Sequence, residues 1–331
     1  MFGYVLQTVF ELRMMIGDGG EVHLLDAPVV LGAGPVGRSV AAALVARGIR
    51  PRVVTRSGTT IDGAEPCQAD LADPDGARAA VGGATVAFQC AQPAYHRWRK
   101  DFPDIQRSVV RACEASGAVL VAIENLYGYG PVSVPMTEDL PMRPTTRKGA
   151  VRAAMWTELL DAHRSGRVRA AAVRASDFFG AGVRDSAFGE RFFAPLVSGG
   201  KAQILGSPQA RHAITYVPDL AEAAVRVAED PSAWGRAWHA PTAPAITQLA
   251  LVEAAARAAG VAPAFVAVKP WQLRLVGAVN PGARETVEML YEFDRDFVVD
   301  SSAFETHFGQ RPTPLDRALA ETAAWYRRAQ T

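Results

Sequence analysis

Short apolar runs alternate with segments of helical periodicity through the first half of the chain. The apolar runs predict buried strands at 28–31, 52–55, 85–90, 118–123 and 169–174. Between them, apolar positions recur every three or four residues and predict helices at 36–47, 73–81, 102–115 and 147–163. This alternation predicts a parallel sheet that is covered by helices on both faces.

The pattern becomes irregular after residue 179, where loops, short helices and proline clusters follow one another. One regular segment returns at 212–230, and we expect it to rejoin the sheet domain. We therefore predict an α/β fold with a doubly wound parallel sheet of Rossmann type over 24–178. A smaller substrate-binding domain is expected mainly from 179–331. Residues 1–23 are interpreted as an extension, either an amphipathic helix or a disordered segment.

Composition narrows the class of protein further. The chain has 331 residues, of which 49% are hydrophobic, so it can bury a large core. A net charge of +1 gives no reason to expect nucleic acid or an anionic membrane as partner. Cys67, Cys90 and Cys113 lack metal-ligand spacing and are typical of reduced thiols. No apolar run reaches the about 18 residues of a membrane span, and we expect a cytoplasmic protein.

A glycine-rich turn joins the first predicted strand to the first predicted helix. Gly32 permits a tight turn, Gly34 lets the backbone approach phosphates, and Gly37 lets the helix pack closely on the strand. Pro35 and Val36 begin the helix, whose N-terminus would face a pyrophosphate. The turn and its flanks together predict a dinucleotide-binding site.

The end of the second strand bears on the choice of nucleotide. NAD-binding proteins usually carry a carboxylate here, which holds the ribose 2′-hydroxyl. This chain has Thr55, Arg56 and Ser57 instead, with no carboxylate until Asp62. An arginine with hydroxyl neighbours suits a 2′-phosphate, and Arg38 is placed to assist. We favour NADP; the alternative is NAD, with Arg56 as a solvated surface residue.

These segments together resemble the extended or atypical short-chain dehydrogenase/reductase superfamily, in its NAD-dependent epimerase/dehydratase branch. The matching segments are 32–37, 69–71, 88–91, 126–128, 173–180 and 214–220. The resemblance runs from about residue 24 to the C-terminus. It implies an NAD(P)-binding domain, followed by a smaller substrate domain built mainly from the second half.

The resemblance also implies further cofactor contacts. Asp70, next to Leu71, would hydrogen-bond the adenine amino group, while Ala91 and Gln92 would line the ribose and the nicotinamide. The alternative for Asp70 is a surface carboxylate that initiates a helix. Cys90 precedes the nicotinamide segment and is expected to be a buried strand residue.

The family couples hydride transfer to a proton relay that is incomplete in this chain. Relatives carry a Tyr four residues before a Lys, together with a Ser or Thr on the fifth strand. Lys148 lies where the family lysine belongs, but Pro144 occupies the tyrosine position. The segment 121–125 contains neither Ser nor Thr. Lys148 is still expected to hold the hydroxyls of the nicotinamide ribose.

Several polar residues that follow the predicted strands at 118–123 and 169–174 are candidates to replace the missing groups. Tyr127 would supply a phenol, although it has the alternative of packing under the cofactor. Glu124 would polarise a carbonyl or bind a hydroxyl; its alternative is an ion pair with Lys148. Asp177 follows the sixth strand and would reach the cofactor, or else cap the backbone. We take Lys148, Tyr127 and Glu124 as the catalytic candidates.

Three functions remain open. The favoured one is an NAD(P)-dependent oxidoreductase that acts on a small carbonyl or alcohol with a rearranged proton donor. The second is a sugar-nucleotide epimerase or dehydratase, in which Arg211 would bind substrate phosphates. The third is a non-catalytic NADP-binding sensor or partner protein. We expect a small-molecule substrate, and the resemblance implies a homodimer through helices at 101–116 and 147–163.

Overall fold

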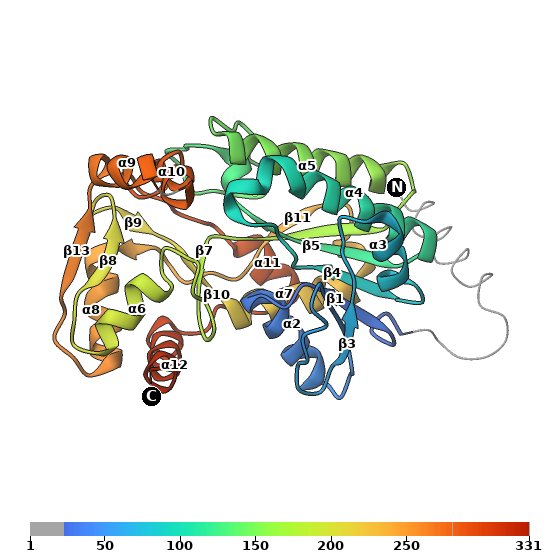
Figure 1. Cartoon of the computed structure of the whole chain (residues 1–331), viewed down its shortest axis with the longest axis horizontal. Coiled ribbons are helices and arrows are strands. Elements are labelled where there is room, and N and C mark those ends of the chain that lie inside the picture. The colour runs from blue at the N-terminus through green and yellow to red at the C-terminus, as the bar shows by residue number, and fades with distance from the viewer. Residues whose placement is uncertain (1–22, 280, 331) are drawn as a thin grey trace.

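A seven-stranded parallel sheet forms the larger part of the structure, a computed structural model that describes residues 23–279 and 281–330 (Figure 1). The expected extension at 1–23 lies outside the described residues except for its last one. The strand order is β3-β2-β1-β4-β5-β6-β11. The strands are β1 (Pro28–Leu31), β2 (Arg52–Thr55), β3 (Glu65–Gln68), β4 (Val86–Gln89), β5 (Val119–Asn125), β6 (Ala170–Ala175) and β11 (Ala237–His239). The predicted fold class, an α/β sheet of Rossmann type, is confirmed.

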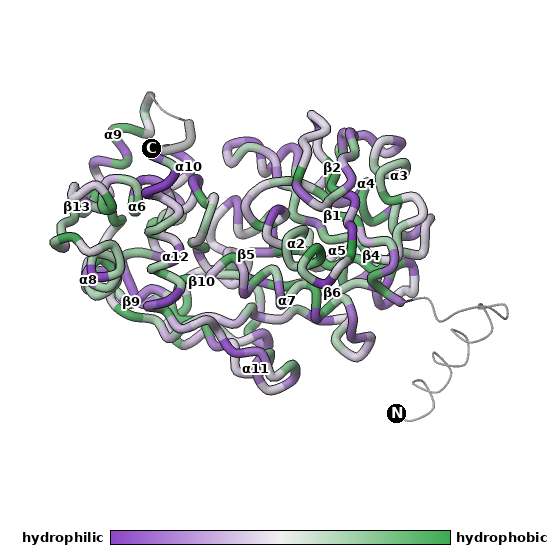
Figure 2. The backbone as a smooth tube through the Cα atoms, turned by 90° about the horizontal axis from the view of Figure 1, so that it is seen from below, coloured by the Kyte–Doolittle hydropathy of each residue, from purple (hydrophilic) through white to green (hydrophobic). Residues whose placement is uncertain are grey.

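Helices cover both faces of this sheet because successive strand residues point to opposite sides. One face is covered by α3 (Pro74–Val81), α4 (Trp98–Ser116) and α5 (Arg147–Arg164), and the other by α2 (Pro35–Val45) and α7 (Val217–Glu229). Val29 belongs to the first of these two cores and Val30 to the second. Hydrophobic positions gather where the strands meet α2 and α7 (Figure 2).

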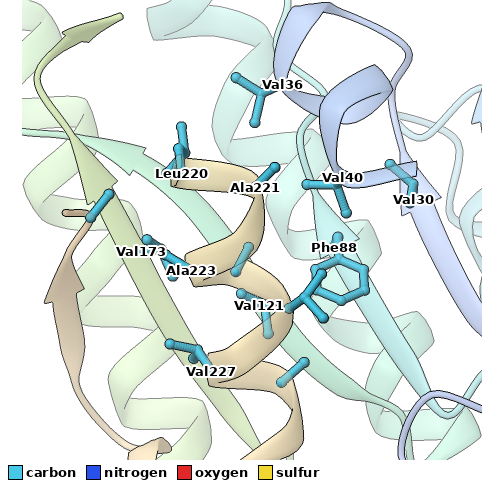
Figure 3. Close-up of a cluster of buried hydrophobic side chains, with 14 of the residues drawn as sticks. Val30, Val36, Val40, Phe88, Val121, Val173, Leu220, Ala221, Ala223 and Val227 are labelled. Atoms are coloured by element: carbon cyan, nitrogen blue, oxygen red, sulfur yellow. The ribbon is translucent and has the colours of Figure 1, made fainter. Parts of the chain in front are cut away.

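The helix α7 brings a segment from the second half of the chain back onto the sheet. Figure 3 shows Ala221, Ala223 and Val227 of α7 among the strand residues Phe88 and Val121. All five side chains are fully buried. Small alanine side chains let the helix backbone approach the strands closely, which explains why an alanine-rich segment suits this position.

A second part of the molecule carries its own core and lies beside the sheet (Figure 1). Its strands are short: β7 (Asp177–Phe179), β8 (Ala202–Leu205), β9 (Arg211–His212), β10 (Ile214–Tyr216), β12 (Ile246–Thr247) and β13 (Phe265–Val268). Its helices are α6 (Glu190–Val197), α8 (Gln248–Ala259), α9 (Pro270–Val279), α10 (Pro281–Val287) and α12 (Leu315–Arg328), while α11 (Ser302–Phe308) packs beside β11. Short 3-10 helices are η1 (Tyr95–Arg97), η2 (Tyr127–Tyr129), η3 (Pro231–Ala233) and η4 (Leu290–Glu292). Within the described residues, no helix is both long and apolar enough to cross a bilayer.

Three elements differ from the sequence-based expectation. Helix α4 begins at Trp98 rather than at 102, because η1 leads directly into it and Trp98 is buried. Strand β5 continues two residues beyond 123, since Glu124 lies beside an arginine on the neighbouring strand β6. The residues 177–179, expected in a loop, form β7 and pair with β10. Each difference depends on the packing of neighbouring elements rather than on the local pattern.

The glycine turn between β1 and α2 is shaped by close backbone contacts. Gly32 has a φ of +102°, and a Cβ at this position would lie 2.8 Å from the backbone of Ala91. A Cβ at Gly37 would lie 1.9 Å from the carbonyl oxygen of Gly32. Gly34 differs from both, because a Cβ at this position would have no atom within 4 Å. Two glycines are therefore required by packing, whereas the third leaves open space.

We expect Gly37→Ala to lower the free energy of unfolding by about 2 kcal/mol or more, because backbone atoms must move to admit the methyl group. Gly34→Ala is the matched control; it should cost less than about 1 kcal/mol, since only a helix N-cap position changes. Urea denaturation of both variants measures the difference. Equal stability of the two variants would contradict the packing argument.

Candidate functional site

A cavity of about 140 Å³ lies at the carboxyl edge of the central sheet. Four loops that follow β1, β4, β5 and β6 contribute to its wall, as the common direction of these parallel strands requires. The residues from these strand ends and loops are Val36, Cys90, Ala91, Gln92, Ile123, Glu124, Asn125, Leu126, Tyr127, Ala175, Ser176, Asp177 and Phe178. The second part of the chain adds Asp185, Ser186, Glu292 and Phe297. The cavity therefore lies where both halves of the chain meet.

The start of α2 fits the phosphates of a dinucleotide. Gly34 is the N-cap of this helix, and no side chain caps it, so the first backbone N–H groups are left for another partner. Pro35 begins the helix without an N–H group of its own. The open space beside Gly34 is where a phosphate would approach these donors. The donor set and the space together suit a bound pyrophosphate.

At the predicted adenine end, Asp70 is exposed and Leu71 is buried. Asp70 Oδ1 accepts a hydrogen bond from the backbone N–H of Ala72 at 3.0 Å. The alternative role for Asp70, initiating a helix, belongs instead to Asp73, which caps α3 through the N–H of Gly76. One oxygen of Asp70 is thus used by the backbone, and its predicted contact with adenine stays a prediction.

Arg56 lies on the surface directly after β2. Its backbone carbonyl accepts a hydrogen bond from Gln68 Nε2 at 3.0 Å, which anchors the turn. Its guanidinium forms no hydrogen bond or ion pair with the part of the chain that the structure describes. Arg38 differs, since its Nε donates to the carbonyl of Ala33 at 3.0 Å. Arg56 is therefore placed to meet an anion from solution.

Cys90 lies directly after β4 and on the wall of the cavity. Burial raises the pKa of its thiol to about 12, so the thiol stays protonated near neutral pH. Its Cβ would lie 3.4 Å from a Cβ at Gly37, which places Cys90 against the glycine turn. Cys90 was expected to be a buried strand residue, but it lies one residue beyond β4 and is only partly buried. Its contacts are those of a packing residue.

Lys148 is almost fully buried at the start of α5, with 3% of its side chain exposed. Its ammonium group pairs with Glu285 on α10 and with Glu288, which follows α10, at 3.1 Å. It also lies 4.3 Å from the centre of the Tyr95 ring. Lys148 is not part of the cavity wall. The alternative in which Lys148 pairs with Glu124 is wrong, since Lys148 is held by carboxylates from the C-terminal half.

Glu124 is instead paired with arginines inside the protein. Its Oε2 lies 3.1 Å from Arg174 Nε, and its Oε1 lies 3.8 Å from Arg152 Nη2. All three residues are at least 95% buried. Arg152 also donates to the carbonyl of Ile123 at 3.1 Å. Glu124 therefore holds two buried cations, one of which reaches the cavity.

Arg152 is a site residue that the sequence analysis did not identify. It lies four residues after Lys148, so the two cations share one face of α5. In the sequence, a second basic residue one helical turn after Lys148 was the signal that could have pointed to Arg152.

Tyr127 lines the cavity from η2, and its hydroxyl lies 3.5 Å from the hydroxyl of Tyr95. Burial raises the pKa of Tyr127 well above its ordinary value, and the neighbouring Tyr95 raises it further. The phenol therefore remains protonated near neutral pH and can donate a hydrogen bond. A family tyrosine is activated by a lysine that lowers its pKa, and Tyr127 shows the opposite shift.

The cavity also holds a group of ionisable residues that spans the two halves of the chain. Asp177 Oδ2 lies 2.9 Å from His212 Nε2, and His212 Nδ1 lies 3.1 Å from the backbone carbonyl of Glu292. The imidazole stacks on Phe293 and on Phe297, with ring centres at 4.8 and 5.0 Å. Glu292 was missed because a single carboxylate within an aromatic run gives no motif.

Comparisons with known proteins agree with the fold. Residues 29–238 match the NAD dependent epimerase/dehydratase family. No curated protein sequence matches the chain. Many solved structures share its fold.

The crystal structure of gox2253 is 24% identical, covers 92% of this chain and 98% of its own, and has a TM-score of 0.75. UDP-glucose 4-epimerase from Thermus thermophilus, solved in complex with NAD, is 22% identical and covers 92% and 99%, with a TM-score of 0.72. UDP-N-acetylglucosamine 4-epimerase from Bacillus cereus is 15% identical and covers 91% and 96%, with a TM-score of 0.73. The family match over 29–238, on a sheet with an open dinucleotide turn, shows that the chain belongs to the NAD-dependent epimerase/dehydratase family of enzymes.

Proposed function

We propose that the protein is an NADP-dependent oxidoreductase that acts on a small carbonyl or alcohol substrate. The observation that carries this proposal is the cavity, in which the segment 90–92 and Glu292 face one space. The segment 90–92 is where the family places the nicotinamide. When bound, the nicotinamide would supply or accept the hydride. The residues of the chain would orient the substrate, exclude water and move its proton.

The cofactor would lie along the edge from the glycine turn to the cavity. Gly32, Gly34 and Gly37 would admit the pyrophosphate, with Pro35 and Val36 at the start of the helix. Asp70 and Leu71 would lie at the adenine, and Cys90, Ala91, Gln92 and Asp177 at the nicotinamide end. Lys148 remains the candidate for the ribose hydroxyls, and it would exchange one of its two carboxylate partners for them.

NADP is favoured over NAD by the surroundings of Arg56. Arg56 is exposed, and the hydroxyl groups of Ser57 and Thr59, one and three residues further along the chain, bond each other at 2.9 Å. A 2′-phosphate is doubly charged and accepts several hydrogen bonds, so a guanidinium with nearby hydroxyls suits it.

A sugar-nucleotide epimerase or dehydratase is the second candidate. Similar structures such as the Thermus thermophilus UDP-glucose 4-epimerase with NAD favour it. One observation weighs against it. Arg211, the candidate for substrate phosphates, is exposed and paired with Asp296 at 2.8 Å, away from the cavity wall.

Arg56→Ala should weaken NADPH binding by about 10- to 100-fold, because a charge-assisted contact with the 2′-phosphate is lost. NADH binding should remain unchanged, since NADH lacks this phosphate. Titration calorimetry with both nucleotides measures the effect. Arg50→Ala, at another exposed arginine before β2, is the matched control. An equal loss for NADH and NADPH would assign Arg56 a role in folding instead.

Purified protein should oxidise NADPH in the presence of at least one member of a panel of small aldehydes and ketones. Loss of the absorbance of reduced nicotinamide measures the reaction.

The Gly34→Ala variant should fold normally but bind the nucleotide weakly, because its methyl group fills the space beside the phosphate donors. Tightly bound NAD, with thermal stabilisation by UDP-glucose, would favour the epimerase instead.

Glu124→Gln should reduce the free energy of unfolding by about 3–5 kcal/mol, because two buried guanidinium groups lose their counter-charge. Asp75→Asn is the control: its ion pair with Arg78 is exposed, and its loss should cost less than about 1 kcal/mol. Urea denaturation of the two variants compares the costs. If Glu124→Gln keeps full stability but loses turnover, Glu124 acts in the reaction and its pairing is secondary.

A further inference from the structure

Glu292 is a buried carboxyl residue on the wall of the cavity. Only 1% of the residue is exposed. Its Oε1 atom has no hydrogen-bond partner among the described residues. A buried polar atom without a partner costs about 1–3 kcal/mol. Because this atom belongs to a residue of the cavity wall, a molecule bound there can supply the missing partner.

The backbone around Glu292 is held by the ring of His212. The Nδ1 atom of His212 donates to the carbonyl of Glu292 at 3.1 Å. Phe293 and Phe297 both stack on this ring. The imidazole therefore has little freedom to rotate, and it fixes the start of the Glu292 side chain relative to the cavity.

The hydrogen bonds of His212 also determine where a proton must lie. A backbone carbonyl can only accept a hydrogen bond, so Nδ1 carries a proton. The other nitrogen, Nε2, lies 2.9 Å from a carboxylate oxygen of Asp177. A hydrogen bond between these atoms requires a second proton, shared by the two residues. The Asp177–His212 pair is then neutral overall, although each side chain carries part of a charge.

We propose that Glu292 is the catalytic acid–base group of the cavity, in place of the tyrosine that the family uses. This inference rests on the proposed oxidoreductase function. In the reduction, the reduced nicotinamide would supply a hydride to the carbonyl carbon, while Glu292 gives its proton to the carbonyl oxygen. The C=O double bond becomes a single bond, with new C–H and O–H bonds. Glu292 is left as a carboxylate and regains a proton from water.

The charges that face Glu292 suit this role. Burial raises the pKa of Glu292 well above its ordinary value, and the carboxylate of Asp177 raises it further, whereas the hydroxyl of Tyr291 lowers it by a smaller amount. Besides Asp177, the ionisable groups that interact with it are His212, Tyr95, Tyr127 and the adjacent Tyr291. Glu124, Arg152 and Asp185 line other parts of the same cavity. Burial raises the pKa of each of the three tyrosines, which therefore remain uncharged near neutral pH. A raised pKa favours the protonated form of Glu292, which is the form that a proton donor needs.

Asp177 and His212 act as positioning residues in this arrangement. Release of the Glu292 proton creates a carboxylate close to Asp177, and two like charges would repel each other. The proton shared with His212 offsets the charge of Asp177 and makes this step easier. His212→Phe should therefore raise the pKa of Glu292 further, while preserving the aromatic stack.

Infrared spectroscopy of the protein without substrate tests the protonation of Glu292. The wild-type protein should show the carbonyl stretch of a protonated carboxylic acid near neutral pH, and Glu292→Gln should lack it. Glu253→Gln, at an exposed glutamate of α8, is the control and should leave the band unchanged. A spectrum of Glu292→Gln that matches the wild type in this region would overturn the proposal.

The pH dependence of stability gives a second test without substrate. A carboxyl whose pKa is raised in the folded state makes unfolding easier as pH rises from its ordinary pKa of 4.5 through the folded value. Glu292→Gln removes the ionisable group and with it this pH-dependent loss of stability. The melting temperature of the variant relative to the wild type should therefore increase from about pH 5 to about pH 8. A difference that is independent of pH would indicate a purely structural role.

The catalytic step is tested with NADPH and a carbonyl compound that the wild-type protein reduces. Glu292→Gln should lower kcat by about 10²- to 10⁴-fold while NADPH affinity remains unchanged, and Glu292→Asp should retain part of the activity. In the wild type, the rate of reduction should fall at high pH as Glu292 ionises. Undiminished turnover by Glu292→Gln refutes the Glu292 proposal alone. A wild-type protein that binds no NADPH refutes the proposed function, whereas the infrared result is independent of it.

Discussion

The parallel register of the central strands is the constraint on which the rest of the structure depends. Leu31 of β1 pairs with Gln89 of β4, and Gln89 pairs with Ala122 of β5. β1 and β4 end at this level, β5 continues to Asn125, and all of them run in the same direction, so the loops after them open at one edge of the sheet. The position of the glycine turn and the wall of the cavity are both consequences of this register.

The two halves of the chain contribute different charges to the cavity. The sheet half supplies Arg152 and its buried partner Glu124, each of which offsets the charge of the other in a dry interior. The C-terminal half supplies Glu292, and His212 joins it to Asp177 of the sheet edge. The ionisable groups of the cavity therefore come from positions other than those of the family tyrosine and serine.

Much of the fold was predictable because it depends on local patterns. The glycine turn, the strand at 52–55 and the helix at 147–163 follow from spacing, propensity and capping, and the structure contains all three. The site was less predictable. Glu124 extends β5 only because Arg174 lies beside it on β6, and Lys148 meets carboxylates that are more than 130 residues away. The sequence carries no pattern for such pairs, since their spacing along the chain is arbitrary.

The amino-acid sequence by itself determined the class of fold, the dinucleotide turn and the absence of the usual tyrosine and serine. These features are local, because they depend on residues within a few positions of one another. Only the tertiary structure decided which ionisable groups share the cavity and which of them are buried in ion pairs. A charge in a protein interior is governed by the groups around it, and burial and partners are properties of three-dimensional packing. For this reason the sequence showed that the family tyrosine is absent, whereas the position of Glu292 on the cavity wall became evident only from the tertiary structure.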